Sequence, residues 1–276
     1  MVPSRQYCKG PVQAVIFDWA GTIVDYGSYA PTKVLIEAFA EREVPVSLAE
    51  ARVPMGLPKW DHILALGNLP AVAQRWRERH GRAFTTQDVD ALYARFMPLQ
   101  IEYIADYSGV IPGVLEVLED LRDRGIRLGS SSGYPREVMA KLERCAASQG
   151  LKLDHTVAGD DLKPGGRPGP WMALANVIEL GVRDVAACVK VDDTEPGIVE
   201  GLSAGMWTVG VALSGNETGL TLDEVMALPE AERLRRRDRA ADRLLGWGAH
   251  YVVDTVAELP GVLRQIDARL QGGDRP

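Results

Sequence analysis

The stretch of residues 12–25 constrains the fold of this chain more than any other. Its apolar, β-branched run ends abruptly in a carboxylate, Asp18, and Gly21 and Thr22 follow. Short apolar runs of this kind are typical of strands buried in a parallel sheet. Open α/β sheets bind ligands at the carboxyl ends of their strands, so Asp18 is a candidate functional group. A strand that merely ends in a polar residue would have the same pattern. Other parts of the chain must therefore show whether Asp18 is a functional group.

Composition sets broad limits on the kind of protein. The 276 residues carry a net charge of -7, which argues against a general nucleic-acid or anionic-membrane partner. The three cysteines, Cys8, Cys145 and Cys188, are widely spaced and odd in number, so we expect reduced packing residues. Residues 1–11 lack the apolar core of a signal peptide, and no later run is long enough to span a bilayer. These features predict a cytoplasmic protein.

A helical block follows the first strand. Residues 26–105 show helical apolar spacing and no convincing strand, and Ser47 with Glu50 forms a capping-box pattern. The helices are expected at residues 32–40, after Ser47, and at 59–66, 71–80 and 87–105. A crossover between parallel strands needs only about a dozen residues. The sequence therefore predicts a helical cap, residues 26–105, inserted into a core made of residues 1–25 and 106–276.

An alternation of helices and short apolar strands then resumes. Helices are expected at residues 113–124, 135–149 and 171–179, and strands at 126–133, 155–158, 186–191, 206–211 and 249–253. This alternation predicts an α/β fold with a doubly wound, Rossmann-like parallel sheet. The Arg-rich run at 233–243 has interspersed acids and helical spacing, which is typical of a solvated helix face.

Polar residues end three of the expected strands. They are Asp18, the pair Ser132 and Gly133, and the pair Asp192 and Asp193. Carboxyl ends of parallel strands meet at one edge of a sheet, so these groups should converge. Converging carboxylates repel each other unless a cation lies between them. A hard divalent ion with oxygen ligands, Mg²⁺ above all, would resolve the repulsion and favour a phosphoryl substrate.

Groups suited to phosphate oxygens accompany the carboxylates. The Ser132 hydroxyl and the Gly133 amide can donate hydrogen bonds to them. A cation from the loop at residues 163–170, either Lys163 or Arg167, can balance their charge. The sequence therefore predicts a site for phosphoryl chemistry.

Four segments together resemble the motifs of the haloacid dehalogenase superfamily. They are residues 18–22, Ser132 with Gly133, the basic loop with Arg167, and Asp192 with Asp193. The resemblance implies that Asp18 attacks phosphorus to form an aspartyl-phosphate. It also implies that Asp18, the backbone carbonyl of Ala20 and Asp193 bind Mg²⁺, and that the helical block is a mobile cap.

One position departs from the superfamily pattern. Its phosphatases usually carry a second Asp two residues after the nucleophile as a general acid, and here that position is Ala20. Lys59 offers another way to activate a leaving group. It follows a Pro/Gly turn at an expected helix N-terminus, where the helix dipole should lower its pKa. A neutral lysine can form a Schiff base that accepts the electrons of a breaking phosphorus–carbon bond. His62, one helical turn away, could shuttle protons.

Five segments resemble the phosphonatases, the branch of the superfamily that hydrolyses phosphonoacetaldehyde. These segments are residues 18–22, 55–62, 132–134, 166–172 and 204–211. The resemblance implies Schiff-base chemistry at Lys59, phosphate contacts from Ser132, Gly133 and Arg167, and accessory pocket positions at Met55, His62 and Tyr134. Gly197 stands where many relatives have another Asp, which leaves Asp193 as the firm metal ligand of that motif.

The implied reaction is Mg²⁺-dependent hydrolysis of phosphonoacetaldehyde to acetaldehyde and phosphate, in 2-aminoethylphosphonate degradation. Family members commonly dimerise through the cap, and the apolar helix near residues 34–39 would permit a homodimer. Two alternatives remain open at this point. One is a phosphomonoester phosphatase of the same fold, which would need a general acid from elsewhere. The other is a catalytically silent phosphate-binding relative.

Overall fold

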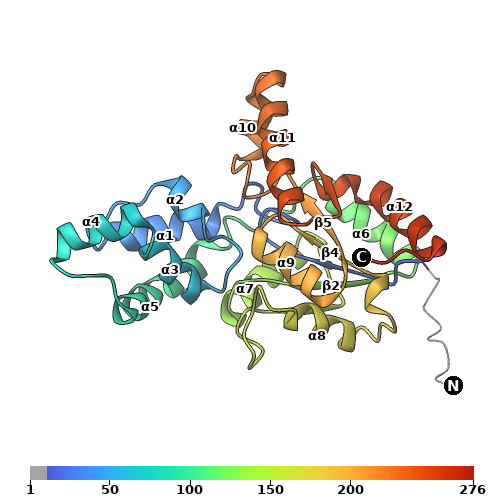
Figure 1. Ribbon diagram of the computed structural model, residues 1–276, viewed down its shortest axis with the longest axis horizontal. Helices are drawn as coiled ribbons and strands as arrows, with labels where there is room; N and C mark the ends of the chain where they lie inside the picture. Colours follow the sequence, from blue (N-terminus) through green and yellow to red (C-terminus); the bar gives the residue numbers. More distant parts are fainter. Residues whose placement is uncertain (1–10) are drawn as a thin grey trace.

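The core of the molecule is a parallel sheet of six strands. The computed structural model describes residues 11–276, and Figure 1 shows the sheet between two layers of helices. The spatial order is β3-β2-β1-β4-β5-β6, and every neighbouring pair is parallel. The strands are β1 (Ala14–Phe17), β2 (Arg127–Ser131), β3 (His155–Val157), β4 (Cys188–Asp192), β5 (Trp207–Val211) and β6 (Tyr251–Val253). The predicted doubly wound α/β fold is confirmed.

The order of the strands reverses direction between β1 and β4. The chain runs outward from β1 to β3 on one side, then returns to the other side of β1 and continues from β4 to β6. Such a switch point leaves a crevice at the carboxyl ends of the two central strands. Asp18 directly follows β1, and β4 ends at Asp192. The topology therefore places both acidic motifs at this crevice.

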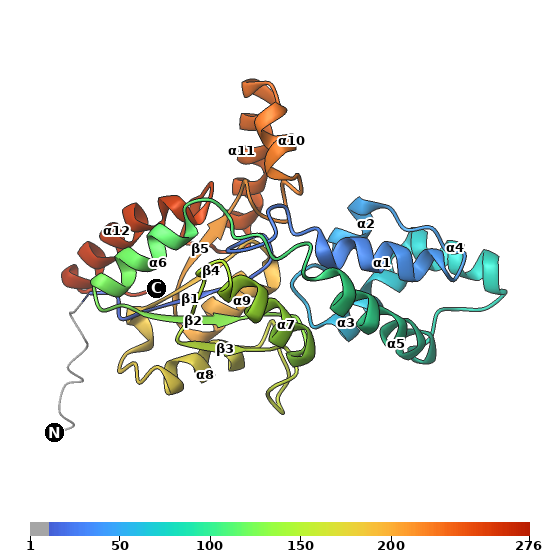
Figure 2. The same ribbon diagram turned by 180° about the vertical axis from the view of Figure 1, so that it is seen from behind.

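Helices cover both faces of the sheet. In β1, Val15 and Phe17 belong to the large core on one face, while Ala14 and Ile16 pack with residues of α8 (Trp171–Glu179) on the other. This alternation is the two-residue period of a strand buried on both sides. The other core helices are α6 (Val114–Asp123), α7 (Arg136–Ala147), α9 (Glu195–Ala204) and α12 (Leu259–Gly272), and both views show α6 beside α12 (Figures 1 and 2).

Element boundaries differ from the prediction at β4. The strand begins at Cys188, two residues later than expected, because Val185–Ala187 form a 3₁₀ turn. The Asp184 side chain accepts a hydrogen bond from the Ala186 amide and so caps this turn. A local side-chain bond of this kind competes with the sheet ladder.

The predicted cap consists of five helices at one end of the molecule (Figure 2). They are α1 (Ala30–Ala40), α2 (Leu48–Arg52), α3 (Lys59–Gly67), α4 (Pro70–His80) and α5 (Thr86–Tyr103). No strand interrupts residues 26–105, all of which the structure describes, and the Ser47 capping box is present. A hydrophobic cluster drawn only from residues 34–99 fills this bundle. A separate core is what the proposed division at residues 25 and 106 requires.

The cap also bears on the predicted dimer. Val34, Leu35, Ala38 and Phe39 on α1 are all buried inside the cap. The apolar face that suggested a dimer contact is thus already covered within the chain. The homodimer stays a prediction, and the apolar face of α1 no longer supports it.

Two further helices project from the core between β5 and β6 (Figure 1). They are α10 (Leu222–Ala227), which the sequence did not predict, and α11 (Glu230–Gly246). The Arg-rich run lies on α11, as expected, and several of its cations are paired. Arg237 lies 2.8 Å from Asp254, and Arg236 lies 2.8 Å from Glu232. Within residues 11–276, no helix is long and apolar enough to cross a membrane. Cys145 and Cys188 are unbonded, and Cys8 lies outside the described residues.

Candidate active site

The carboxyl edge of the sheet gathers three buried carboxylates. Asp18, Asp192 and Asp193 each place an oxygen within 4.8 Å of the others. The Asp18 amide donates to the carbonyl of Val191, 2.9 Å away, which continues the β1–β4 ladder and brings the two motifs side by side. The predicted convergence of these residues is therefore observed.

Asp18 is held on one side only. Its Oδ1 accepts a hydrogen bond from Arg167 Nη2 at 2.8 Å, whereas Oδ2 has no hydrogen-bond partner in the described part of the chain. The pKa of Asp18 is raised to about 6, because burial and the nearby Asp192 outweigh the opposing effect of Arg167 and Lys190. The unpartnered oxygen leaves Asp18 free to act on a ligand.

Asp193 faces Asp18 and is fixed by the loops around it. The Asn216 amide donates to its Oδ2 at 2.7 Å, and the Thr22 hydroxyl donates to its Oδ1 at 3.2 Å. Gly21 adopts a φ of 86°, and a side chain there would overlap the Asp193 carboxylate. Burial, with Asp18 and Asp192 adding to it, raises the pKa of Asp193 well above its ordinary value.

Asp192 has a different set of partners. Its Oδ1 accepts hydrogen bonds from the Thr194 amide and hydroxyl, at 3.0 and 2.8 Å. Its Oδ2 forms ion pairs with Lys190 at 2.9 Å and Arg167 at 3.0 Å. A side chain at Gly197 would overlap this carboxylate, so the glycine makes room for Asp192. Because Arg167 and Lys190 already balance the charge of Asp192, whereas Asp193 accepts hydrogen bonds from neutral donors, Asp18, Asp193 and the Ala20 carbonyl are the better candidates for a cation.

The choice between Lys163 and Arg167 is settled by burial. Arg167 is only 4% exposed and lies against Asp18, whereas Lys163 is exposed. Arg167 Nε donates to Glu200 at 2.9 Å, and Nη2 also donates to the Ser131 carbonyl at 2.9 Å. Three carboxylates around it raise the pKa of Arg167, so it stays charged.

Sequence reasoning missed Lys190 and Glu200. Both side chains are completely buried, Lys190 on β4 and Glu200 on α9. The available signal was a lysine inside an apolar strand, since a fully buried lysine needs a partner. The sequence did not indicate that partner.

The cap supplies Lys59, the first residue of α3. Its side chain is 5% exposed, and its ammonium lies 5.1 Å from the ring centre of Tyr134. The pKa of Lys59 is lowered to about 8, chiefly by burial; Asp18 opposes the shift and Arg167 adds to it. The shift has the predicted direction, but burial rather than the helix N-terminus is its main cause.

One small cavity joins the cap to the core. Its volume is about 20 Å³, which is room for about one water molecule. The lining comprises Asp18, Ala20, Ser28, Pro31, Met55, Gly56, Lys59, Ser132, Gly133, Tyr134, Arg167 and Thr194. A Cβ on Gly133 would lie 2.8 Å from the Leu57 carbonyl, so cap and core backbones touch at this glycine. The cap therefore closes directly over the strand ends.

Of the predicted site residues, Asp193 and His62 do not line this cavity, and His62 lies farther inside the cap, where it contacts α2. Its Nε2 lies 2.9 Å from the Ala51 carbonyl and donates to it, which ties α3 to α2. Burial, reinforced by Lys59, lowers the pKa of His62 to about 3. The imidazole is therefore neutral near pH 7, and the structure does not support the expected proton shuttle.

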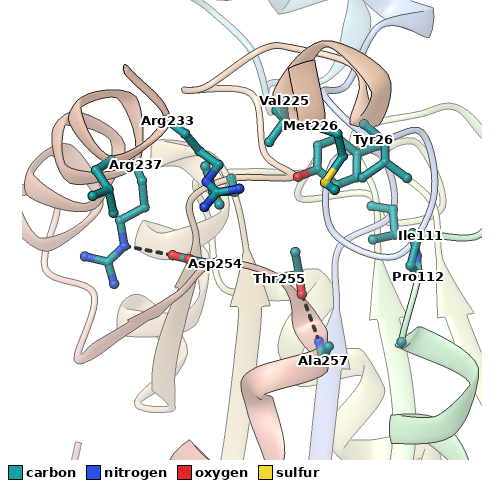
Figure 3. A pocket seen from close by; sticks show the side chains of 14 residues that line it. Tyr26, Ile111, Pro112, Val225, Met226, Arg233, Arg237, Asp254, Thr255 and Ala257 are labelled. Carbon is teal, nitrogen blue, oxygen red and sulfur yellow. Dashed lines mark hydrogen bonds and ion pairs between the residues drawn. The ribbon is translucent and has the colours of Figure 1, made fainter. Parts of the chain in front are cut away.

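Two larger cavities are not lined by Asp18, Asp192 or Asp193. One of about 650 Å³ lies between cap and core and includes Arg52, Met55 and Thr194. Another, of about 500 Å³, lies beneath α10 and α11 (Figure 3). Its lining includes Tyr26, Met226 and Arg233 but none of the predicted site residues. The small cavity is therefore where most of the predicted site residues converge.

Comparison with known proteins agrees with this geometry. A family model described as haloacid dehalogenase-like hydrolase matches residues 12–205. A Klebsiella pneumoniae protein named phosphonoacetaldehyde hydrolase is 59% identical, over 96% of this chain and 99% of its own. A Vibrio cholerae protein of the same name is 58% identical, over 97% of this chain and 99% of its own.

A solved structure extends the similarity to three dimensions. The phosphonoacetaldehyde hydrolase-like protein of Oleispira antarctica superposes with a TM-score of 0.97 at 43% identity, covering 100% of both chains. Both cap and core are therefore shared with a relative of known structure. The chain belongs to the haloacid dehalogenase-like hydrolase family and, within it, to the group of proteins named phosphonoacetaldehyde hydrolase.

Proposed function

We propose that this protein hydrolyses the phosphorus–carbon bond of phosphonoacetaldehyde, giving acetaldehyde and phosphate. The relatives' names support this substrate. The observation that carries the proposal is that Lys59 and Asp18 line the same small cavity. An amine of lowered pKa suits a carbonyl substrate, and a buried carboxylate suits attack on phosphorus.

Lys59 acts first in the proposed sequence. Its neutral amine attacks the aldehyde carbon, and loss of water gives an imine. With a pKa of about 8, about a tenth of the amine is neutral at pH 7. The protonated imine can then accept the electron pair of the neighbouring phosphorus–carbon bond. This route needs no general acid at position 20, which agrees with Ala20.

Asp18 then takes the phosphoryl group. Its carboxylate forms a bond to phosphorus while the phosphorus–carbon bond breaks, and the electron pair leaves an enamine on Lys59. Protonation of the enamine carbon and hydrolysis of the resulting imine release acetaldehyde. Water attacks the aspartyl-phosphate and releases phosphate, which restores Asp18.

The residues around Asp18 fit a divalent cation. Burial and repulsion from neighbouring carboxylates raise the pKa values of both Asp18 and Asp193, and a cation bound beside them would relieve that repulsion. We propose Mg²⁺, held by Asp18, Asp193 and the Ala20 carbonyl. When bound, it would offset the negative charge of the phosphonate beside the Asp18 carboxylate.

The remaining lining residues suit the two ends of the substrate. Ser132, Gly133 and Arg167 present donors for phosphoryl oxygens, while Met55 and Tyr134 form a wall beside Lys59. A space of about 20 Å³ cannot hold a phosphonate. Substrate therefore has to reach the site with the cap displaced, and closure over it excludes water.

Three wider proposals rest on the family resemblance. They are a cytoplasmic location, a place in 2-aminoethylphosphonate degradation, and a homodimer formed through the cap. Sedimentation at micromolar concentration tests the dimer, and a monomer would contradict it.

Trapping the imine tests the mechanism. Borohydride added with phosphonoacetaldehyde should inactivate the enzyme and leave a secondary amine on Lys59, detected by peptide mass spectrometry. Borohydride without substrate is the control. Retained activity without a modified Lys59 would contradict the imine step. Phosphate release from simple phosphomonoesters, at rates equal to those with phosphonoacetaldehyde, would instead indicate a phosphatase.

A further inference from the structure

A network of buried charges surrounds Arg167 and extends beyond the residues that line the cavity. Lys190 and Glu200 belong to this network, and neither lines the cavity. The side chains of Arg167, Asp192, Lys190 and Glu200 are each at most 1% exposed. Burying four charged groups has a large desolvation cost, so the arrangement calls for a physical reason.

Two of the three nitrogens of the Arg167 guanidinium are held by the protein. Nε donates to Glu200 Oε2 at 2.9 Å, and Nη2 donates to Asp18 at 2.8 Å and to the Ser131 carbonyl at 2.9 Å. No residue in 11–276 forms a hydrogen bond with Nη1, although Arg167 lines the cavity. A planar guanidinium held at two nitrogens has a fixed direction for the third.

Glu200 reaches this guanidinium from α9 on a face away from the cavity. All its hydrogen bonds use one oxygen, Oε2, which accepts from Arg167 Nε and, at 3.0 Å, from the Ser131 hydroxyl. The other oxygen, Oε1, is buried without a hydrogen-bond partner among the described residues. The carboxylate is thus directed at Arg167 and the end of β2.

Lys190 supplies the opposing charge. Its ammonium lies 2.9 Å from Asp192 and 3.6 Å from Glu200, and it donates to the Ser131 hydroxyl at 3.0 Å. Both carboxylates also bind Arg167, so without Lys190 they would face each other with only one cation between them. Lys190 therefore offsets the negative charge of both carboxylates and helps to hold them in place around the guanidinium.

We propose that Glu200 and Lys190 are positioning residues, which orient Arg167 so that its free Nη1 meets a phosphoryl oxygen. This inference rests on the proposed function, since it assigns Arg167 a phosphoryl ligand. Without the Glu200 contact, the guanidinium could rotate, and Nη1 would lose its fixed direction. Neither Glu200 nor Lys190 touches the substrate.

A double-mutant cycle separates positioning from a general structural role. Glu200→Gln removes the charge while keeping the shape, and we expect kcat/KM to fall about 10- to 100-fold. A lysine at position 167 has no Nε group to contact Glu200. In an Arg167→Lys background, Glu200→Gln should therefore lower kcat/KM by at most about threefold. Lys190→Met should behave like Glu200→Gln. Equal losses in both backgrounds, or wild-type kcat/KM in Glu200→Gln, would overturn the proposal.

The matched control is Thr208→Val, a near-isosteric change of another fully buried polar residue in the sheet. It should leave kcat/KM unchanged, and thermal unfolding of every variant identifies those that fail to fold. Variants Lys190→Met and Glu200→Gln that both fail to fold would assign the network to stability and overturn the proposal.

Binding of inorganic phosphate gives a readout independent of turnover. Calorimetry with Mg²⁺ present should show about tenfold weaker binding in Glu200→Gln than in the wild type, and no change in Thr208→Val. A wild type that binds phosphate but does not hydrolyse phosphonoacetaldehyde would refute the proposed function and leave this inference standing. Equal phosphate affinities in the wild type and Glu200→Gln would refute the inference alone.

Discussion

The core and cap sides of the cavity differ in whether a buried charged group has an ion-pair partner. Burial is the largest influence on both sides, and it raises the pKa of Asp18 to about 6 and lowers that of Lys59 to about 8. Each shift favours the neutral form of the group. The core opposes this effect with Arg167 and Lys190, whereas on the cap side Lys59 lies beside the ring of Tyr134 without an ion pair in the described residues.

This difference matches the two proposed roles. A nucleophilic carboxylate has to remain ionised, and a Schiff-base lysine has to lose its proton. A sheet edge suits the first task because rigid strands can hold several charges close together. A helical cap suits the second because it encloses one amine without supplying a strong counter-ion.

The largest effects are expected when the cap lysine and the core carboxylate are inactivated separately, which tests whether their two roles are independent. Lys59→Arg keeps the positive charge but cannot form an imine, so phosphorus–carbon cleavage should fall by at least about a thousandfold. Phosphate binding on the core, measured by calorimetry, should persist. The reciprocal variant, Asp18→Asn, should also be inactive but still be trapped on Lys59 by borohydride. Loss of phosphate binding in Lys59→Arg would show that the two sides are not separable.

The pH dependence of kcat/KM tests the proposed role of Lys59 on the cap side. A Lys59 pKa of about 8 means that the reactive amine increases about tenfold per pH unit below that value and levels off above it. The kcat/KM for phosphonoacetaldehyde should therefore rise between pH 6 and pH 8. A profile that is flat across this range would contradict an amine of lowered pKa as the essential group in the free enzyme.

The contact between the two sides can be weakened at Arg52. This cap residue donates to the carbonyls of Gly27, Asn216 and Gly219, and the Asn216 amide in turn binds Asp193. Arg52→Met should destabilise the closed cap and raise KM by about tenfold, the effect of one or two lost hydrogen bonds. Arg82→Met, which removes an exposed ion pair within the cap, is the control. Identical KM values for the wild type and Arg52→Met would exclude Arg52 as a closing contact.

The smallest expected effect concerns cap stability in acid. His62 is held neutral with a pKa of about 3, whereas the unfolded residue titrates near 6.5. The unfolded chain therefore binds the extra proton, and this stabilising contribution, present above pH 6.5, is lost as the pH falls towards 3. Between pH 7 and pH 5.5 the loss is about 1 kcal/mol.

His62→Gln removes this titration. Urea unfolding at pH 7 and pH 5.5 should show a drop in stability about 1 kcal/mol smaller in the variant than in the wild type. Equal drops would indicate that His62 is protonated in the folded state. That result would restore the proton-shuttle hypothesis.

Most of the architecture could be predicted because its signals are local. The apolar strands, the helical spacing of residues 26–105 and the Ser47 capping box each depend on neighbouring residues, and all appear in the structure. The helix of residues 222–227 was missed because it is short and Val225 is its only buried residue. A pattern of buried faces cannot reveal a helix that buries few residues.

The site was predictable only in part. Parallel strands bring their carboxyl ends to one edge, so the meeting of Asp18 with Ser132 and Asp193 follows from the order of the elements. The selection of Arg167 over Lys163 does not, because both lie in the same turn-rich loop. His62 was placed near the chemistry by helical spacing, but its neighbours on α2 bury it away from the cavity.

The sequence by itself determined the fold class, and it placed the proposed nucleophile at the end of β1 and the lysine at the start of α3. Each follows from residue order and local pattern. Only the tertiary structure decided which charges surround Arg167 and how far the pKa of Lys59 falls. Both depend on desolvation and on contacts between residues far apart in the chain, and a linear pattern does not specify such contacts.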